Sequence, residues 1–190
     1  SGDLFNLFVF LEITAIASYA LVAYGVEANE LEASLKYQVL GGLGSMFFLL
    51  SIAFFYALTG TLSLSDAARI LSQQGPSLPM YFSGILIMIS VFIKAAIMPF
   101  HAWLPDAHPS APAPVSAMLS GVVIKVLGIY VFIRLFFNVF GFYTFLHLQT
   151  LLYILGSVSM LFGALLAIGQ NDFKRLLAYS SISQIGYVVV

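Results

Sequence analysis

The sequence predicts an all-α integral membrane protein, a polytopic bundle of about six transmembrane helices. Of its 190 residues, 61% are hydrophobic and only 8% are charged, and the mean hydropathy is +1.03. A soluble domain carries about 25% charged residues. The apolar residues also gather into runs near the length of roughly 20 residues that a helix needs to cross a bilayer. We therefore expect the whole chain to be surrounded by lipid.

The apolar runs define the expected helices in order, each ended by a short polar or Pro-rich segment. The predicted spans cover residues 4–25, 35–58, 80–104, 115–137, 145–169 and 173 to the end, which makes five complete spans and a partial sixth. Residues 62–73 predict a short amphipathic helix at the membrane surface. There, Ser63 and Asp66 resemble a capping box, and Leu64, Ala68 and Leu71 form an apolar stripe.

The two ends of the chain fall close to or inside apolar runs. It starts at Ser1 without a methionine and stops within "GYVVV", and no secretory signal is present. We expect a fragment of a longer polytopic protein, in which residues 1–190 form one transmembrane domain.

Composition excludes several functions. The net charge of −1 and the lack of a basic run argue against nucleic-acid binding. The absence of cysteine excludes disulfides, thiolate metal sites and iron–sulfur clusters within this chain. The three histidines, His101, His108 and His147, lack a spacing suited to zinc or to paired haem ligands. We expect no metal, no cofactor and no catalytic redox site here, so any redox chemistry belongs to a partner.

Three ionisable residues, Glu12, Lys94 and Lys125, fall near the centres of predicted spans. Insertion of such a charge costs about 2.5–3.5 kcal/mol, and intramembrane charges usually face the bundle interior and mark ion paths. Two structural alternatives stay open: an ion pair between packed helices, or lysines that reach to the membrane surface. The second suits Lys36, which lies at a span end, better than Lys94 or Lys125.

Helical spacing gives Lys94 an inward orientation, because Ser83, Ser90, Lys94 and His101 are seven, four and seven residues apart. A polar stripe on an apolar helix avoids lipid. Lys125 shares its face with small residues, at offsets of −8, −4 and +3 (Ala117, Gly121 and Gly128), which favours close packing against protein.

Pro99 predicts a break in the third span. It cannot donate a hydrogen bond to the carbonyl of Ala95, one residue from Lys94. Such breaks line wet cavities or are simple kinks, and both interpretations stay open. His101 could join a proton path or cap the broken helix. We expect Trp103 to be an interfacial anchor.

The stretch "IKAAIMPFHAWLPDAHPSAPAPVSAMLSGVVIKVLGIYVFIR" resembles the central signature of the antiporter-like subunits of respiratory complex I. The same family includes the D-type subunits of multisubunit sodium/proton antiporters and the membrane arms of energy-converting [NiFe] hydrogenases. The segments "GDLFNLFVFLEITAIASYAL", "LKYQVLGGLGSMFFLLSIAFFYALTGTLSL" and "NDFKRLLAYSSISQIGYVVV" fit this family in the same order. In the family, two inverted five-helix repeats lie within about fourteen helices.

The resemblance implies roles for individual residues. Glu12, Lys94 and Lys125 match the ionisable residues of the family's fifth, broken seventh and eighth helices, which form a proton relay. Lys36 matches a lysine that often opens the sixth helix, and with His101 it is a further candidate for the proton path. Residues 1–137 would hold most of the first half-channel repeat, and residues 138–190 the start of the second.

We therefore expect a subunit that translocates protons through a Glu/Lys relay within a redox-driven, complex I-like or hydrogenase complex. The resemblance implies a prokaryotic cell membrane, other membrane subunits as partners, and protons, or alternatively sodium, as the transported ion. Two alternatives are a sodium/proton antiporter subunit and a non-conducting scaffold with structural ion pairs. A solute transporter is disfavoured, because the polar groups are few and mostly ionisable.

Overall fold

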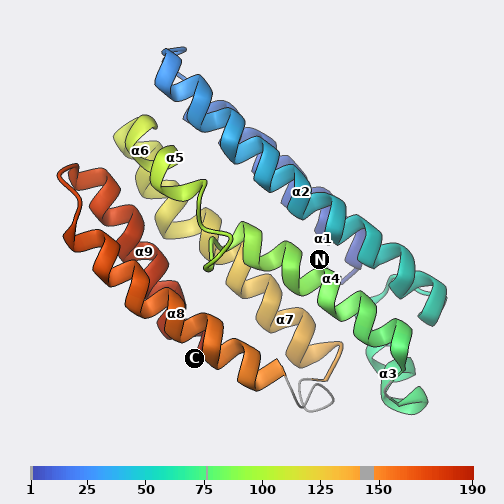
Figure 1. Cartoon of the computed structure of the whole chain (residues 1–190). Helices are drawn as coiled ribbons and strands as arrows, with labels where there is room; N and C mark the ends of the chain where they lie inside the picture. Colours follow the sequence, from blue (N-terminus) through green and yellow to red (C-terminus); the bar gives the residue numbers. More distant parts are fainter. Residues whose placement is uncertain (1, 76, 142–147) are drawn as a thin grey trace.

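The computed structural model describes residues 2–75, 77–141 and 148–190, and this part of the chain is built from helices. Within it, four helices are long and apolar enough to cross a membrane: Leu4–Val22, Ala28–Thr59, Ala113–Asn138 and Leu148–Ile168. A shorter apolar helix covers Leu78–Lys94. Figure 1 shows the long helices side by side, with the N-terminal pair on one flank and the C-terminal pair on the other. The predicted all-helical membrane bundle is confirmed.

The N-terminal flank consists of α1 (Leu4–Val22) and α2 (Ala28–Thr59). The side chain of Asp3 caps α1 by accepting a hydrogen bond from the Asn6 amide at 2.7 Å. The surface helix α3 (Leu64–Gln74) is capped by Ser63, as its sequence predicts, and buries Leu64, Ala67 and Leu71. The apolar stripe therefore runs through Ala67 rather than Ala68.

The third span is interrupted where Pro99 lies, but the interruption is longer than predicted. Helix α4 (Leu78–Lys94) ends at Lys94, residues 95–103 form turns, and α5 (Leu104–Ser110) follows. The predicted break near Pro99 is confirmed, and the non-helical stretch already begins at Ala95. Asp106 and His108, which the Pro-rich sequence suggests for a loop, lie in α5.

Trp103 is not an interfacial anchor, because its side chain is buried with 1% exposure. Its indole N–H donates to the carbonyl of Ile93 at 2.9 Å, and its ring stacks on Tyr37 with centroids 4.1 Å apart. The helix end at Lys94 leaves carbonyl groups without intrahelical partners. Trp103 supplies one of the missing donors from within the bundle.

The centre and the C-terminal flank complete the bundle. A continuous helical rod runs from Ala113 to Asn138 through α6 (Ala113–Met118), two π-helical segments η1 (Leu119–Val123) and η2 (Lys125–Tyr130), and α7 (Val131–Asn138). The last pair is α8 (Leu148–Ile168) and α9 (Phe173–Val189), which pack on each other. The predicted start of the fifth span at residue 145 and His147 lie outside the described residues.

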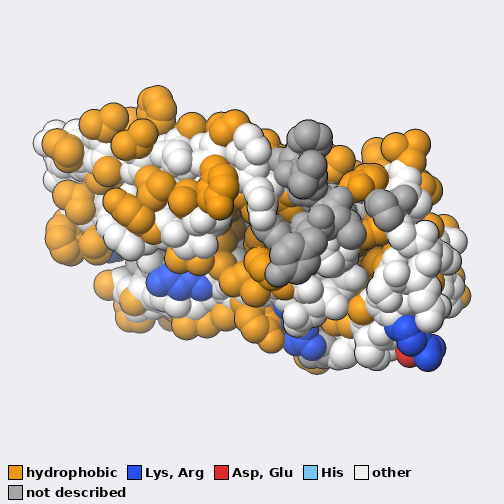
Figure 2. Space-filling model, turned by 90° about the horizontal axis from the view of Figure 1, so that it is seen from below, with side chains coloured by type: hydrophobic (Ala, Val, Ile, Leu, Met, Phe, Trp, Pro, Cys, Tyr) orange, Lys and Arg blue, Asp and Glu red, His pale blue; other side chains and the backbone are white. Residues whose placement is uncertain are grey.

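The outer surface is strongly apolar. Large hydrophobic side chains such as Phe10 and Leu165 are more than 60% exposed. The face in Figure 2 is largely covered by hydrophobic side chains, with few charged groups. A soluble monomer rarely exposes apolar patches of this extent, so this surface is suited to lipid or to neighbouring membrane subunits.

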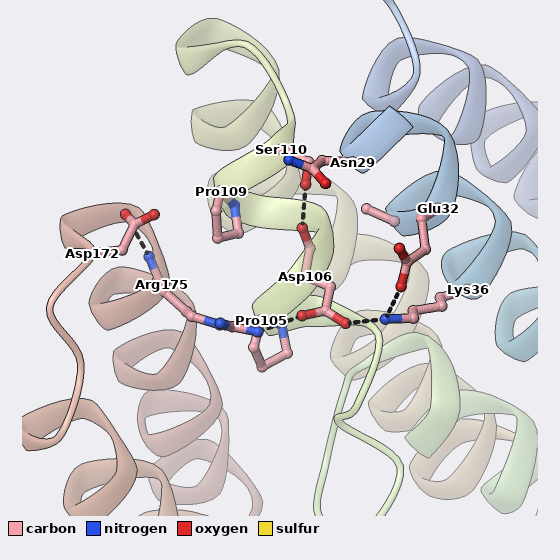
Figure 3. Close-up of a pocket in the computed structure, with 10 residues that line it drawn as sticks. Asn29, Glu32, Lys36, Pro105, Asp106, Pro109, Ser110, Asp172 and Arg175 are labelled. Atoms are coloured by element: carbon pink, nitrogen blue, oxygen red, sulfur yellow. Dashed lines mark hydrogen bonds and ion pairs between the residues drawn. The ribbon is translucent and has the colours of Figure 1, made fainter. Parts of the chain in front are cut away.

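Charged side chains clamp α5 between α2 and α9 at one end of the bundle (Figure 3). The Asp106 carboxylate accepts from Lys36 Nζ at 2.9 Å and from Arg175 Nη2 at 2.5 Å. Lys36 also pairs with Glu32 on its own helix at 2.8 Å. These residues line a pocket of about 260 Å³. Asp106 therefore joins three helices through one side chain.

Helices α8 and α9 hold the interrupted span at two further points. Lys174 Nζ donates to the carbonyls of Pro109 and Ala111, at 3.2 and 2.7 Å, where α5 ends. The Ser159 hydroxyl of α8 accepts from the amide of Met98, inside the interruption, at 3.0 Å. The non-helical backbone of residues 95–103 is thus fixed partly by groups from the C-terminal flank.

The first prediction tests the clamp. Asp106→Asn removes the charge that Lys36 and Arg175 share, so we expect the melting temperature of the purified full-length protein to fall by a few degrees. A domain of this size loses about 2–4 °C per kcal/mol. Because exposed ion pairs are screened by salt, the deficit should shrink at 1 M salt. Glu32→Gln is the control, since Glu32 pairs only with Lys36 on the same exposed helix face. A salt-independent deficit would contradict the clamp.

The second prediction tests the packing beside the break. A methyl group at Gly128 would lie 2.5 Å from Ala95 Cβ and 3.0 Å from the Ala95 amide nitrogen. Overpacking of this kind costs about 1–3 kcal/mol, so Gly128→Ala should lower the melting temperature measurably. Gly121→Ala, on the same rod, is the control because nothing lies within 4 Å of the added methyl. Equal melting temperatures for the two variants would refute the close contact.

Candidate functional site

The candidate site is a triad of Glu12, Ser45 and Lys94, contributed by α1, α2 and α4, in which Ser45 and Lys94 are buried and the Glu12 side chain is 25% exposed. Lys94 is only 6% exposed, and its Nζ lies 3.1 Å from Glu12 Oε1 and 3.0 Å from Ser45 Oγ. The Ser45 hydroxyl also donates to Glu12 Oε1 in a short hydrogen bond. Both charges are thus paired and hydrogen-bonded, the condition under which ions are tolerated inside a protein.

The chain places Lys94 at a helix end. It is the last residue of α4, and the backbone of Ala96 then enters the left-handed region with φ of 54°. This conformation costs an alanine roughly 1–2 kcal/mol. It is held by hydrogen bonds from the amides of Ala96 and Ile97 to the carbonyls of Ile93 and Phe92, at 3.2 and 3.1 Å. A cation at a helix C-terminus is also favoured by the helix dipole.

The predicted polar stripe is confirmed for Ser83, Ser90 and Lys94, which lie on α4. It does not continue to His101, because α4 ends at Lys94. Ser83 and Ser90 are fully buried, and Ser83 hydrogen-bonds to Ser51 of α2 at 2.9 Å. The Ser90 hydroxyl is buried without a hydrogen-bond partner among the described residues. His101 lies beyond the helix end, so the seven-residue spacing does not put it on this face. Its half-buried ring lies 6.4 Å from that of Tyr179.

Lys125 lies at a second place, in a groove of about 530 Å³ between the α6–η2 part of the rod and α9. Its side chain is exposed there, and within the described ranges it makes no hydrogen bond or ion pair. Leu127, two residues on, is buried and lines a small cavity beside Lys94. Residues two apart on a helix point in nearly opposite directions. Lys125 therefore points away from the Lys94 cavity.

The groove around Lys125 has a mostly apolar surface with several polar side chains at its edges. Ser116, Ser120, Ser181, Gln184 and Lys174 also line it. The expected face of small residues is only partly formed, because Ala117 and Gly121 line the groove while Gly128 packs against Ala95. The π-helical turns of η1 and η2 widen the helical repeat and shift this register.

The structure thus brings Glu12 and Lys94 together. Lys125, His101 and Lys36 lie at other places, and Lys36 takes part in the ion pairs of Asp106. Sequence reasoning missed Ser45 and Asp106. Ser45 stands in the small-residue run "GGLGS" of α2, which indicates close helix approach and could have drawn attention to it. Among the described residues, no group of three or more His, Asp or Glu side chains could hold a metal ion.

A lysine paired with one carboxylate and one hydroxyl has two accessible states. The pair favours the ammonium, whereas loss of the carboxylate partner in a dry environment favours the neutral amine. The site is therefore able to bind and release a proton when Glu12 moves or is protonated. This chemistry needs no bound group.

Comparison with known proteins identifies the family of this chain. The whole chain, residues 1–190, matches the family described as "NADH:quinone oxidoreductase/Mrp antiporter, TM". It is 38% identical over 201 residues to the NADH-quinone oxidoreductase subunit N of Desulforudis audaxviator. It is also 38% identical over 194 residues to the D-type subunit of the Na(+)/H(+) antiporter of Alkalihalophilus pseudofirmus. Both alignments cover 100% of this chain and 38% of the relative.

A solved structure shares the fold over the entire chain. It is that of the membrane-bound sulfane sulfur reductase, an archaeal respiratory membrane complex, with a TM-score of 0.90 and 40% identity. The match covers 100% of this chain and 38% of the other chain. The chain thus spans less than two fifths of the length of the relatives that it matches. Fold and sequence agree that it belongs to the family of antiporter-like membrane subunits shared by NADH:quinone oxidoreductases and Mrp antiporters.

Proposed function

We propose that this protein translocates protons across the membrane through a buried relay that includes the Glu12–Lys94 pair. The observation that carries the proposal is a lysine with 6% exposure, inside an apolar bundle, whose one ionic partner is a single carboxylate at 3.1 Å. A purely structural role could be filled by apolar side chains at no cost in stability. A titratable pair at this depth is better explained by ion transport.

The energy scale of such a pair suits the task. Two unit charges about 4 Å apart interact by about 4 kcal/mol at an effective dielectric constant of 20. Moving one charge across 100 mV costs about 2.3 kcal/mol. Making and breaking one pair is therefore enough to gate one proton against a membrane potential. Glu12 would hold the proton on Lys94 while the two are in contact, and their separation would release it.

Lys125 is the proposed next residue of the relay. Its position in a separate groove, away from Lys94, means that a proton could pass between them only through water or a side-chain movement. His101, half-buried beside Tyr179, and Lys36 remain candidates for the path. Lys36 also has a structural part through Asp106, so its participation would require the clamp to open.

The driving energy would come from partner subunits. Two of the similar proteins are named as a quinone oxidoreductase subunit and a respiratory membrane complex. We propose that this protein likewise works as a non-redox subunit of a larger, redox-driven membrane complex. The strongly apolar outer surface offers the contact area that neighbouring subunits would need.

The third prediction separates transport from scaffolding. Arginine stays charged in essentially any protein site, whereas lysine can lose its proton. If Lys94 releases a proton in each cycle, Lys94→Arg should abolish proton uptake into vesicles holding the full complex, as should Lys94→Met. Arg69→Lys is the control, because it is a charge-conserving change at a side chain that is 72% exposed on the surface helix α3. Blue-native gels report assembly.

A Lys94→Arg complex that assembles and still pumps would overturn the relay and leave a structural ion pair. Loss of pumping with loss of assembly in Lys94→Arg, while Lys94→Met assembles, would mean that steric strain caused the defect. In that case Lys94→Met alone decides: normal pumping counts against the relay, and lost pumping supports it.

The fourth prediction concerns the transported ion. One similar protein is named as a Na(+)/H(+) antiporter subunit, which makes sodium coupling the second candidate function. The one carboxylate at the triad already has a cationic partner, so the triad offers sodium no net negative charge. We expect proton uptake to be unchanged when all sodium is replaced by choline. A rate that rises with sodium concentration and saturates would favour the antiporter function instead.

A further inference from the structure

The ammonium group of Lys94 has one more donor than the triad uses. An ammonium carries three N–H donors. One points to Glu12 and one to Ser45. The third finds no acceptor among the described residues. A buried charged donor without a partner is costly, and such groups are normally satisfied by protein or by ordered water.

Tyr19 presents a second unused polar group nearby. It lies on α1, seven residues after Glu12, and is 8% exposed. Its hydroxyl lies directly against Gly41 of α2, in space that any larger residue would fill. No partner for this hydroxyl exists in the described part of the chain. The hydroxyl is not among the fully enclosed polar atoms without a partner, so a water molecule can reach it.

The ring of Tyr19 is held in a fixed position. It packs edge-on against Tyr37, with centroids 4.5 Å apart at 85°, and Tyr37 in turn stacks flat on Trp103. Trp103 is fixed by its hydrogen bond to the carbonyl of Ile93, one residue before Lys94. The Tyr37 hydroxyl, by contrast, is hydrogen-bonded to Ser18 at 3.0 Å. This stack of aromatic rings fixes the Tyr19 hydroxyl relative to the end of α4.

Lys94 and Tyr19 both border one small cavity. Its volume is about 10 Å³, and both Lys94 and Tyr19 line it, together with Ala15, Tyr37, Gly41, Ile93, Trp103 and Leu127. A cavity of roughly this size is the least that one water molecule needs, and the water needs at least two polar partners. The ammonium and the phenol hydroxyl meet that requirement.

We propose that one water molecule bridges Lys94 Nζ and the Tyr19 hydroxyl in this cavity, and that Tyr19 is the positioning residue that holds it. The water oxygen accepts the third N–H of Lys94, and one water hydrogen is donated to the Tyr19 oxygen. The inference rests on the proposed proton translocation, because the water is then the first carrier available to Lys94 outside the triad. Gly41 is also required for this arrangement, because only glycine at this position leaves room for the Tyr19 hydroxyl.

The direct test is a high-resolution structure of the full complex. A density peak within hydrogen-bonding distance of both Lys94 Nζ and the Tyr19 oxygen supports the proposal, and this peak should be absent from Tyr19→Phe. A direct contact of the third N–H with a protein atom, without such a peak, overturns it.

The functional test is proton uptake into vesicles. Tyr19→Phe keeps the ring and removes only the hydroxyl, so we expect normal assembly with a loss of rate of up to about tenfold, the factor that corresponds to one hydrogen bond between neutral groups. Gly41→Ala should act alike, because its methyl group would lie 2.9 Å from Tyr19 Cζ. The controls are Gly42→Ala, with nothing within 4 Å of the methyl, and Tyr56→Phe, an exposed tyrosine on α2.

The outcomes distinguish this inference from the proposed function. Wild-type rates in Tyr19→Phe, with pumping lost in Lys94→Met, would overturn the water bridge and leave the relay. Normal pumping in Lys94→Met would overturn both. If Tyr19→Phe fails to assemble, the density in the wild-type complex decides.

Discussion

A buried ammonium group must be surrounded by acceptors, and this constraint organises the structure around Lys94. Inserting a lysine into a bilayer costs about 2.5–3.5 kcal/mol even with partial relief. Glu12 from α1 and Ser45 from α2 reduce that cost by converging on Nζ from two helices. The three helices are thus held at one level by the needs of one charge. Removing Glu12 would leave the Lys94 ammonium buried without its ionic partner, which is costly.

Ending α4 at Lys94 creates a second requirement, because a helix end inside a membrane leaves carbonyl groups that water cannot reach. Side chains from inside the bundle supply hydrogen-bond partners for these backbone groups. Trp103 returns to the last turn of α4 to bind Ile93, and Ser159 of α8 binds the Met98 amide inside the interruption. The tryptophan then serves twice, since its ring also supports Tyr37 and, through it, Tyr19. The residues that stabilise the end of α4, Trp103 with Tyr37, therefore also line the cavity next to Lys94.

Much of this architecture could be predicted from the sequence, because bilayer thickness and a proline leave strong local signals. The spans, the surface helix with its Ser63 cap, and the interruption containing Pro99 follow from residues close together in the chain. The contacts of Lys94 do not, since its partners lie 82 and 49 residues away and depend on how neighbouring helices are rotated. Trp103 was misplaced because the sequence predicts a span end there, whereas the backbone turns back into the bundle. The spacing of small residues wrongly placed Gly128 on the same face as Lys125, because π-helical turns change the number of residues per turn.

The contacts of the interrupted segment also connect the two parts of the chain. Residues 1–137 hold the triad, and the segment between α4 and the rod is held in part from α8 and α9, through Ser159, Lys174 and Arg175. Two of these contacts are to backbone carbonyls or amides, which cannot move without changing the path of the chain. A displacement of Met98 or of the end of α5 would therefore have to break hydrogen bonds to α8 or α9.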